Sequence, residues 1–353
     1  MIKYFSSFVK QPIKAGADKL ISDMQATLKS SLEDERIAYK EYSFGKLSNS
    51  IHLLFPSPYS KYLIFGFLGN PFFCSLQLTI VGIFLSCLIA IKKKVSRERF
   101  FVITVDLIGW QSPLWTDNDN SLKERISRYL ENILEKILIS YVADEIISLA
   151  DPEFLRKTYG IKKIHDIEFL EYHVNSQPHP ISEPDCLKVL YAGDLGGRRG
   201  FDLELIEKIL KNLNNNCEFW LVARGLDNIW LSRFKDYKNF RFIGEIPANE
   251  LDSVAQQCHF GLILYSPKYI YYNLAPPIKL SSYVANGLTV ISTNLHRVKD
   301  LNDKYDFGYV FSEEDLISFL RTLSKDKLKN NDLLRQQIVR GTKFQNALHE
   351  IFS

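Results

Sequence analysis

The sequence predicts an α/β protein with two domains, each built on a parallel sheet that carries helices on both faces. Three observations support this fold class. The chain has 353 residues, and a typical domain takes roughly 100 to 200 residues. Segments with strand and helix patterns alternate along both halves of the chain, as they do in parallel α/β sheets. A stretch rich in proline and polar residues, 173–185, separates the two halves and has the composition of a linker.

The first half alternates strand and helix patterns up to residue 161. Strands are predicted at 2–7, 50–56, 62–69, 100–106 and 144–150. Helices are predicted at 15–34, 75–94, 121–143 and 151–161. The helix at 151–161 has Asp151 as its N-cap. These elements complete a first α/β half.

One segment of this half is unusually apolar. Residues 62–91 carry no charge, and a basic run from Lys92 to Arg99 follows them. The length of the apolar run permits a membrane span. Glycine, asparagine and proline at 66–71 interrupt the run, which favours a strand, a turn and an apolar helix buried in a βαβ unit. Three interpretations therefore stay open: a buried helix, a patch that binds an anionic membrane surface, and a true span.

The second half repeats the alternation. Strands are predicted at 187–193, 217–224, 240–246, 260–266 and 289–294, with helices at 202–213, 231–237, 248–258 and 277–287. Further helices are predicted at 315–325 and 331–352. We therefore expect an N-terminal domain at 1–180, a second domain at 181–330, and a C-terminal helix at 331–353 that packs back on the N-terminal domain.

Composition and charge exclude several classes of protein. The net charge is only +3, which is too small for a protein that neutralises many nucleic-acid phosphates, so no nucleic-acid partner is expected. The five cysteines are scattered and form no CxxC pair, which suits a reducing compartment. No His/Cys cluster predicts a metal site, and the amino terminus lacks the apolar core of a secretory signal. We expect a cytoplasmic protein without a metal.

The stretch 265–293 has the strongest chemical pattern. Pro276 and Pro277 predict a helix start, because proline suits a first helical turn. Lys279 lies in that first turn, and Asn273 comes shortly before it. A helix amino terminus and an ammonium group together suit a pyrophosphate at the carboxyl ends of the strands. A helix with well-placed end signals and no ligand is the alternative explanation.

A glycine-rich turn, 193–200, follows the predicted strand at 187–193. Its glycines allow close approach of the backbone, and Arg198 and Arg199 offer charges suited to phosphate oxygens. The turn is neither GxGxxG nor a P-loop. An ordinary strand-to-helix turn with exposed arginines is the simpler explanation.

Together these motifs resemble the nucleotide-sugar-binding domain of GT-B glycosyltransferases. The matching pattern is a strand ending in Tyr-x-Gly, a basic glycine turn, a Phe-x-Gly-x segment and a Pro-x-Lys-Leu-x-x-Tyr-x-x-x-Gly-x-x-Val-Ile helix and strand. These motifs are found at Tyr191 and Gly193, 198–200, 242–245 and 277–291, with Gly225 ending an intervening strand. The resemblance covers about residues 186–320. It is closest to the bacterial branch of glucosyltransferases that act on glycosylated surface proteins, and to related surface-polysaccharide enzymes.

The resemblance implies a GT-B fold, in which two Rossmann-like domains face a central cleft, and a hexosyltransferase activity. It implies a UDP-linked sugar donor, a glycan or glycolipid acceptor, and neither a cofactor nor a metal. The donor residues that it implies are Gly193, Arg198, Arg199, Arg224, Phe242, Ile246, Tyr272, Asn273, Pro277 and Lys279.

The chain departs from the family pattern in one respect. Many retaining members carry a pair of glutamates eight positions apart, and both are absent here, where their positions fall near Leu274 and Ser282. Retention or inversion is therefore undecided. On the acceptor side, Asp106 ends a predicted strand and is the candidate base of an inverting reaction, with Asp117 as the second candidate. Capping of a helix is the simpler role for Asp106. Lys10, Gly16 and Trp110 complete the expected acceptor residues.

Other functions remain as alternatives. A non-catalytic GT-B homologue could serve as a partner subunit or a glycan-binding chaperone. An integral membrane protein would follow from a true span at 72–91, and a GT-B epimerase would act on the UDP-sugar itself. The sequence leaves a homo-oligomer open, and it allows a peripheral position on the inner face of the plasma membrane.

Overall fold

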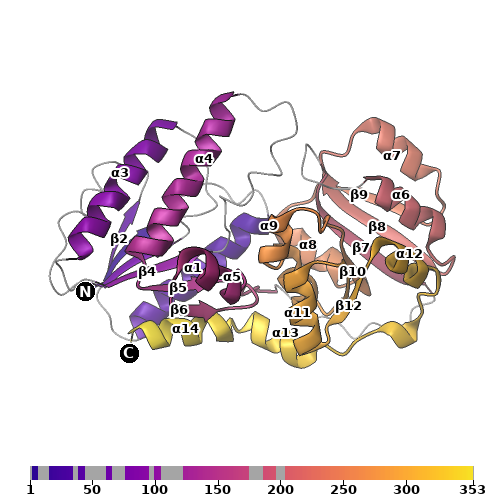
Figure 1. Ribbon diagram of the computed structural model, residues 1–353. Helices are drawn as coiled ribbons and strands as arrows, with labels where there is room; N and C mark the ends of the chain where they lie inside the picture. Colours follow the sequence, from indigo (N-terminus) through magenta and orange to yellow (C-terminus); the bar gives the residue numbers. More distant parts are fainter. Residues whose placement is uncertain are drawn as a thin grey trace. The chain divides into compact units, whose positions relative to one another are not determined.

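The computed structural model describes residues 2–6, 16–34, 39–43, 61–65, 76–94, 99–104, 122–174, 186–195 and 203–352. These residues form two six-stranded sheets, and every strand pair in both sheets is parallel. The chain divides into two compact units (Figure 1). Unit 1 comprises Met1–Pro12, Met24–Glu168 and Lys343–Ser353, and unit 2 comprises Ile13–Asp23 and Phe169–Thr342.

The sheet of unit 1 has the strand order β2-β1-β3-β4-β5-β6. Its strands are β1 (Ile2–Ser6), β2 (Tyr39–Ser43), β3 (Lys61–Phe65), β4 (Arg99–Thr104), β5 (Glu145–Ser148) and β6 (Lys163–Asp166). The helices are α1 (Gly16–Asp34), α3 (Leu76–Lys93), α4 (Leu122–Ile137), a π-helical turn (Leu138–Val142), α5 (Pro152–Tyr159) and α14 (Thr342–Phe352). The strands β3 to β6 follow one another in the sheet, and parallel crossovers are right-handed, so α3, α4 and α5 cover the same face. Helices α3 and α4 pack side by side on it (Figure 1).

Local signals explain how α5 begins and ends. The carboxylate of Asp151 accepts hydrogen bonds from the backbone N–H groups of Glu153 (2.7 Å) and Phe154 (3.4 Å), as an N-cap should. Pro152 is the first helical residue, and Gly160 ends the helix with φ +71°. The predicted capped helix is confirmed.

The sheet of unit 2 has the strand order β12-β11-β10-β7-β8-β9. Its strands are β7 (Leu187–Asp194), β8 (Cys217–Arg224), β9 (Phe240–Gly244), β10 (Phe260–Ile263), β11 (Thr289–Thr293) and β12 (Gly308–Phe311). The helices are α6 (Leu203–Asn212), α7 (Asn228–Lys235), α8 (Ala248–Ala255), α9 (Ile270–Leu274), α10 (Ile278–Ala285), α11 (His296–Tyr305), α12 (Glu313–Arg321), a 3-10 turn (Lys325–Lys327) and α13 (Asp332–Val339). Renumbered from β7, this order is 3-2-1-4-5-6 read from the other edge, which defines a doubly wound Rossmann sheet.

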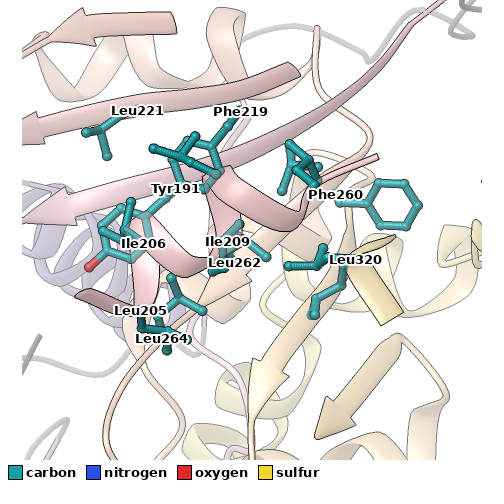
Figure 2. Close-up of a cluster of buried hydrophobic side chains, with 14 of the residues drawn as sticks. Tyr191, Leu205, Ile206, Ile209, Phe219, Leu221, Phe260, Leu262, Leu264 and Leu320 are labelled. Atoms are coloured by element: carbon teal, nitrogen blue, oxygen red, sulfur yellow. The ribbon is translucent and has the colours of Figure 1, made fainter. Parts of the chain in front are cut away.

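The core of unit 2 lies between this sheet and helices α6, α7 and α12. Figure 2 shows a cluster of buried side chains from β7, β8, β10, α6 and α12, with the ring of Tyr191 among them. Phe260 and Leu262 of β10 belong to this cluster. Gly261 between them faces the opposite side of the sheet, where a Cβ atom would lie 2.5 Å from the ring of Tyr283 in α10. Glycine at this position therefore lets α10 pack directly on the sheet.

Several predicted elements differ from the structure. The helix predicted at 331–352 is two helices, because Gly341 adopts φ +59° and separates α13 from α14. Strands β2, β6 and β12 and helices α9 and α11 were not predicted, whereas the strand predicted at 50–56 lies outside the described residues. The prolines of the expected linker also lie outside them. Of the apolar segment 62–91, residues 62–65 belong to β3 and residues 76–91 to α3. No helix in the described ranges combines the length and apolar character that a membrane crossing needs.

Candidate functional site

The candidate site lies at the carboxyl ends of β7 and β10, in the middle of the sheet of unit 2. Strands β8 and β9 extend the sheet on one side of β7. Strands β10, β11 and β12 extend it on the other side. Strands β7 and β10 are therefore neighbours whose following segments lead in opposite directions. In open α/β sheets ligands bind at the carboxyl ends of the strands at such a switch point.

Lys279 places a positive charge at this point. Helix α10 begins at Ile278 with Pro277 as its N-cap, so Lys279 lies in the first turn, as the sequence predicted. Its Nζ atom is buried and lies 4.1 Å from the ring centre of Tyr191 on β7 and 4.8 Å from that of Tyr265. These distances allow cation–π attraction to both rings. A Cβ atom on Gly193 would lie 3.0 Å from the same nitrogen, so the glycine gives the ammonium its space.

Burial changes the protonation of these side chains. Loss of solvent lowers the pKa of Lys279 from 10.5 to about 7. Burial, with the neighbouring phenols of Tyr265 and Tyr283, raises the pKa of Tyr191 well above its usual value. Burial also raises the pKa of Tyr283. The phenols therefore stay neutral, and Lys279 is poised to change charge near neutral pH.

Tyrosine rings support the position of Tyr265. Its ring stacks on Tyr272 of α9 with centres 4.3 Å apart and an angle of 20° between the planes. Tyr269 packs edge-on against Tyr272 at 6.3 Å. Tyr272, a predicted donor residue, thus stacks on the ring that lies next to the ammonium of Lys279. Tyr283 fixes the other side, because its hydroxyl accepts a hydrogen bond from the backbone N–H of Ala192 (2.9 Å).

The side chain of Asn273 binds the protein's own backbone. Its amide nitrogen donates to the carbonyl oxygens of Pro267 (2.8 Å) and Tyr269 (3.2 Å). Its amide oxygen accepts from the N–H of His296 (2.9 Å), the first residue of α11. Asn273 therefore fixes the loop that follows β10 to the start of α11. Its predicted contact with phosphate stays a prediction.

The remaining described donor candidates lie on β8 and β9 or shortly after β9. Arg224 ends β8 and pairs with Asp194 at the end of β7, through Nε (3.0 Å) and Nη2 (2.9 Å) to one carboxylate oxygen. Phe242 on β9 packs against the core cluster, and Ile246 follows that strand. The ion pair of Arg224 is partly exposed, so a ligand phosphate could compete with Asp194 for the guanidinium.

Other predicted residues lie outside the described part of the chain. These are Lys10, Asp106, Trp110, Asp117, Arg198 and Arg199. Gly16 is the first residue of α1. The acceptor side of the prediction therefore stays a prediction.

Sequence reasoning missed Tyr265 as a site residue. Its position two residues after β10, at the same sheet edge as Gly193, was the available signal. Tyr283 appeared in the matching motif, but its hydrogen bond to Ala192 depends on the fold.

Comparisons with known proteins give the fold a name. No family model and no curated sequence matches the chain. Solved structures do match over almost the whole length. A sucrose-phosphate synthase from Thermosynechococcus elongatus is 12% identical, covers 99% of this chain and 98% of its own, and has a TM-score of 0.60. The lipopolysaccharide outer core galactosyltransferase WaaB is 12% identical, covers 99% of both chains and also has a TM-score of 0.60. Anabaena HepE in complex with UDP and glucose is 12% identical, covers 100% and 99%, and has a TM-score of 0.58.

The chain has the GT-B fold. The two Rossmann-like units of this GT-B fold are the two described above, and the fold class predicted from the sequence is confirmed. At 12% identity the likeness establishes the architecture only. What the GT-B chain does must be argued from its own site.

Proposed function

We propose that this chain is a metal-independent glycosyltransferase that moves a sugar from a UDP-linked donor to a surface polysaccharide, glycolipid or glycoprotein glycan. The observation that carries the proposal is the buried ammonium of Lys279 at the switch point of the sheet. A buried cation in the first turn of a helix suits a diphosphate, because both the charge and the helix dipole favour an anion. The similar structures support a UDP-sugar, since HepE is known with UDP and glucose.

The first turn of α10 adds backbone donors to this charge. No side chain caps the helix, because Pro277 at the N-cap has no hydrogen-bonding group. The N–H groups of Ile278 and Lys279 therefore lie at a helix end that no side chain caps. A diphosphate bound there would receive charge-assisted hydrogen bonds from the side chain and further bonds from the helix end.

The same groups would assist departure of the leaving group. In the transfer, the bond between the anomeric carbon and the β-phosphate oxygen breaks, and UDP leaves with the electron pair. A bond forms between the anomeric carbon and an acceptor hydroxyl oxygen, whose proton passes to a base. Lys279 would offset the negative charge that grows on the diphosphate, which is the task that a divalent ion performs in other transferases. Asp106 is our candidate base.

The two positions at which many retaining relatives carry glutamates hold no acidic residue in this chain. Leu274 and Ser282 are both buried, with 6% and 5% of their surfaces exposed. The proposed donor site therefore relies on Lys279, the end of α10 and the neighbouring turn, and it assigns no sugar-binding carboxylate to either position.

Product analysis with a panel of UDP-sugars and glycan acceptors tests the proposal. We expect the wild type to add one sugar to an acceptor, detected by mass spectrometry, and to release UDP. Lys279→Ala should lose this activity, whereas Lys235→Ala, at an exposed lysine in α7, should keep it. UDP binding without turnover on any acceptor would favour the non-catalytic partner subunit. Failure of the wild type to bind UDP would overturn the proposal.

The proposal includes a place for the enzyme in the cell. Acceptors carried on lipid are presented at the inner face of the plasma membrane, so we propose a cytoplasmic protein that is peripheral to that membrane.

A further inference from the structure

Unit 1 carries an apolar surface that the packing of its core does not use. Five of the nine large hydrophobic side chains that are exposed in the described ranges lie on α3, α4 and the π-helical turn after α4. We call this surface the α3–α4 face. It comprises Phe84, Cys87 and Ile91 on α3, Ile126 and Tyr129 on α4, and Tyr141.

These side chains lie on the exposed sides of two helices that pack against each other, or directly after the second helix. On α3 the exposed positions 84, 87 and 91 follow helical spacing, while Ser86 and Ile89 on the opposite side are buried. On α4, Ile126 and Tyr129 are likewise exposed, and Leu134 is buried, as is Leu138 at the start of the π-helical turn. The helices are neighbours on the same side of the sheet (Figure 1). Their exposed sides therefore point together, away from the sheet.

The exposure of the large side chains is high for residues of this kind. Phe84 is 63% exposed, Ile91 65%, Tyr129 68% and Tyr141 61%. Scattered apolar residues on a surface need no explanation, but a contiguous group on two adjacent helices marks an interaction site. Tyrosine suits a boundary between an apolar and an aqueous phase, because its ring is apolar and its hydroxyl is polar.

The charge of this region is positive. Residues 76–94 contain three lysines and no acid, and residues 122–142 contain four basic and three acidic residues. The two segments thus have a surplus of four positive charges, of which three remain after Lys93 is balanced by Asp144. Lys94 and Lys136 are exposed on the same sides of the helices as the apolar residues. Lys93 pairs with Asp144 at 2.6 Å and also donates to the carbonyl of Val142, so it fixes α3 to the turn after α4.

We propose that the α3–α4 face docks on an anionic lipid bilayer, with both helices lying along the headgroup layer. The apolar side chains would enter the outer part of the hydrocarbon, and the exposed lysines would face lipid phosphates. A second copy of the chain is a poorer occupant, because a symmetric contact would bring the two basic surfaces together. Neither helix has to cross the bilayer, in keeping with the helix lengths described above.

Vesicle flotation of the full chain tests this proposal. The probes are vesicles of phosphatidylcholine alone and of phosphatidylcholine with phosphatidylglycerol in equal parts. We expect the wild type to float with the anionic vesicles and far less with the neutral ones. Phe84→Ser with Ile91→Ser should weaken binding at least tenfold. Lys94→Glu with Lys136→Glu should do the same, since each basic residue near an anionic surface contributes roughly 1 kcal/mol.

The matched control is Leu333→Ser, which removes an apolar side chain that is 80% exposed on α13 of unit 2. This variant should float like the wild type. Equal flotation of the Phe84 and Ile91 variant and the wild type would overturn the proposal, as would equal loss in the Leu333 control. A dimer in light scattering that the Phe84 and Ile91 changes dissociate would assign the face to self-association instead. Flotation needs neither donor nor acceptor, and UDP calorimetry on the same variants separates this proposal from that of glycosyl transfer.

Discussion

Replacement of Lys279 by alanine should weaken UDP binding strongly and leave uridine binding almost unchanged. The ammonium is buried between the rings of Tyr191 and Tyr265, so a phosphate that meets it does so away from bulk water. Charge-assisted hydrogen bonds contribute about 1.5 to 3 kcal/mol. At 1.4 kcal/mol per decade, the Kd for UDP should rise roughly 10- to 150-fold. Uridine lacks the phosphates, and its base is expected near Phe242 to Ile246.

The pH dependence of UDP binding supplies a second, independent measure. The pKa of Lys279 is lowered to about 7 by burial, so about half of the free protein carries the charge at neutral pH. An anion stabilises the charged form and raises that pKa. Above neutral pH, binding must therefore be accompanied by proton uptake. Between about pH 7 and pH 8 the Kd of the wild type for UDP should rise about fivefold more than that of Lys279→Ala.

The buried charge of Lys279, which should favour UDP binding, should lower the unfolding free energy of the ligand-free protein. Lysine titrates near 10.5 in the unfolded chain and near 7 in the fold, so the unfolded chain holds more protons between these values. Stability therefore rises with pH across this window. Lys279→Met should lack this rise, and it should be more stable than the wild type below about pH 7, by up to about 5 kcal/mol.

Isothermal titration calorimetry with UDP and uridine, at two pH values, makes these comparisons. Lys235→Ala is the control for loss of a surface lysine, and thermal melting of each variant checks the fold. Unchanged UDP affinity in Lys279→Ala, or equal weakening of UDP and uridine, would refute the assignment of Lys279 to the diphosphate. A pH profile shared by the wild type and the variant would refute the link to the lysine's pKa.

Three further predictions follow from the structure and the sequence. Gly193→Ala should displace the ammonium of Lys279, because the new methyl would lie 3.0 Å from Nζ. We expect UDP binding about fivefold weaker with little change in Tm. Calorimetry and a melting curve measure the two quantities, and unchanged affinity would contradict the prediction. Tyr283→Phe leaves the buried N–H of Ala192 without its acceptor and should cost roughly 1 to 3 kcal/mol in urea unfolding, whereas equal stability would mean that this bond is dispensable. If the reaction inverts, Asp106→Asn should lower turnover about 10²-fold in steady-state kinetics without changing the Kd for UDP. Turnover within a few-fold of the wild type would remove this residue from the mechanism.

The strands that the sequence did not predict share one physical property. Strands β2, β6 and β12 all lie at sheet edges, where only one neighbour is present. A strand in the middle of a parallel sheet is buried on both faces and tends to be apolar, as the run VLYAG in β7 and the sequence FGLI of β10 show. An edge strand such as β6, with the sequence KIHD, is mostly polar and half-exposed. Its strand character comes from pairing with β5, which a local pattern does not contain.

The candidate site was predictable where it depends on local signals. Prolines at a helix start and a lysine in the first turn located α10 and Lys279 before any fold was known. The two rings around that lysine come from β7 and from the segment after β10, and only the sheet order makes them neighbours. The hydrogen bonds of Asn273 to Pro267, Tyr269 and His296 were not predictable from its residue type, because they depend on where the fold places these backbone groups.

Unit 1 is built from separate stretches of the chain, so its folding depends on the order in which they are translated. Helix α14 buries Phe344, Leu348 and Ile351, and Glu350 lies 3.3 Å from His165 on β6, the edge strand of the sheet of unit 1. Residues from Lys343 onward belong to this unit, although they are translated after all of unit 2. During synthesis the amino-terminal half thus leaves the ribosome first, yet it obtains α14 only after all of unit 2 has been translated. A nascent chain stopped before Lys343 would contain all of unit 2 and an unfinished unit 1.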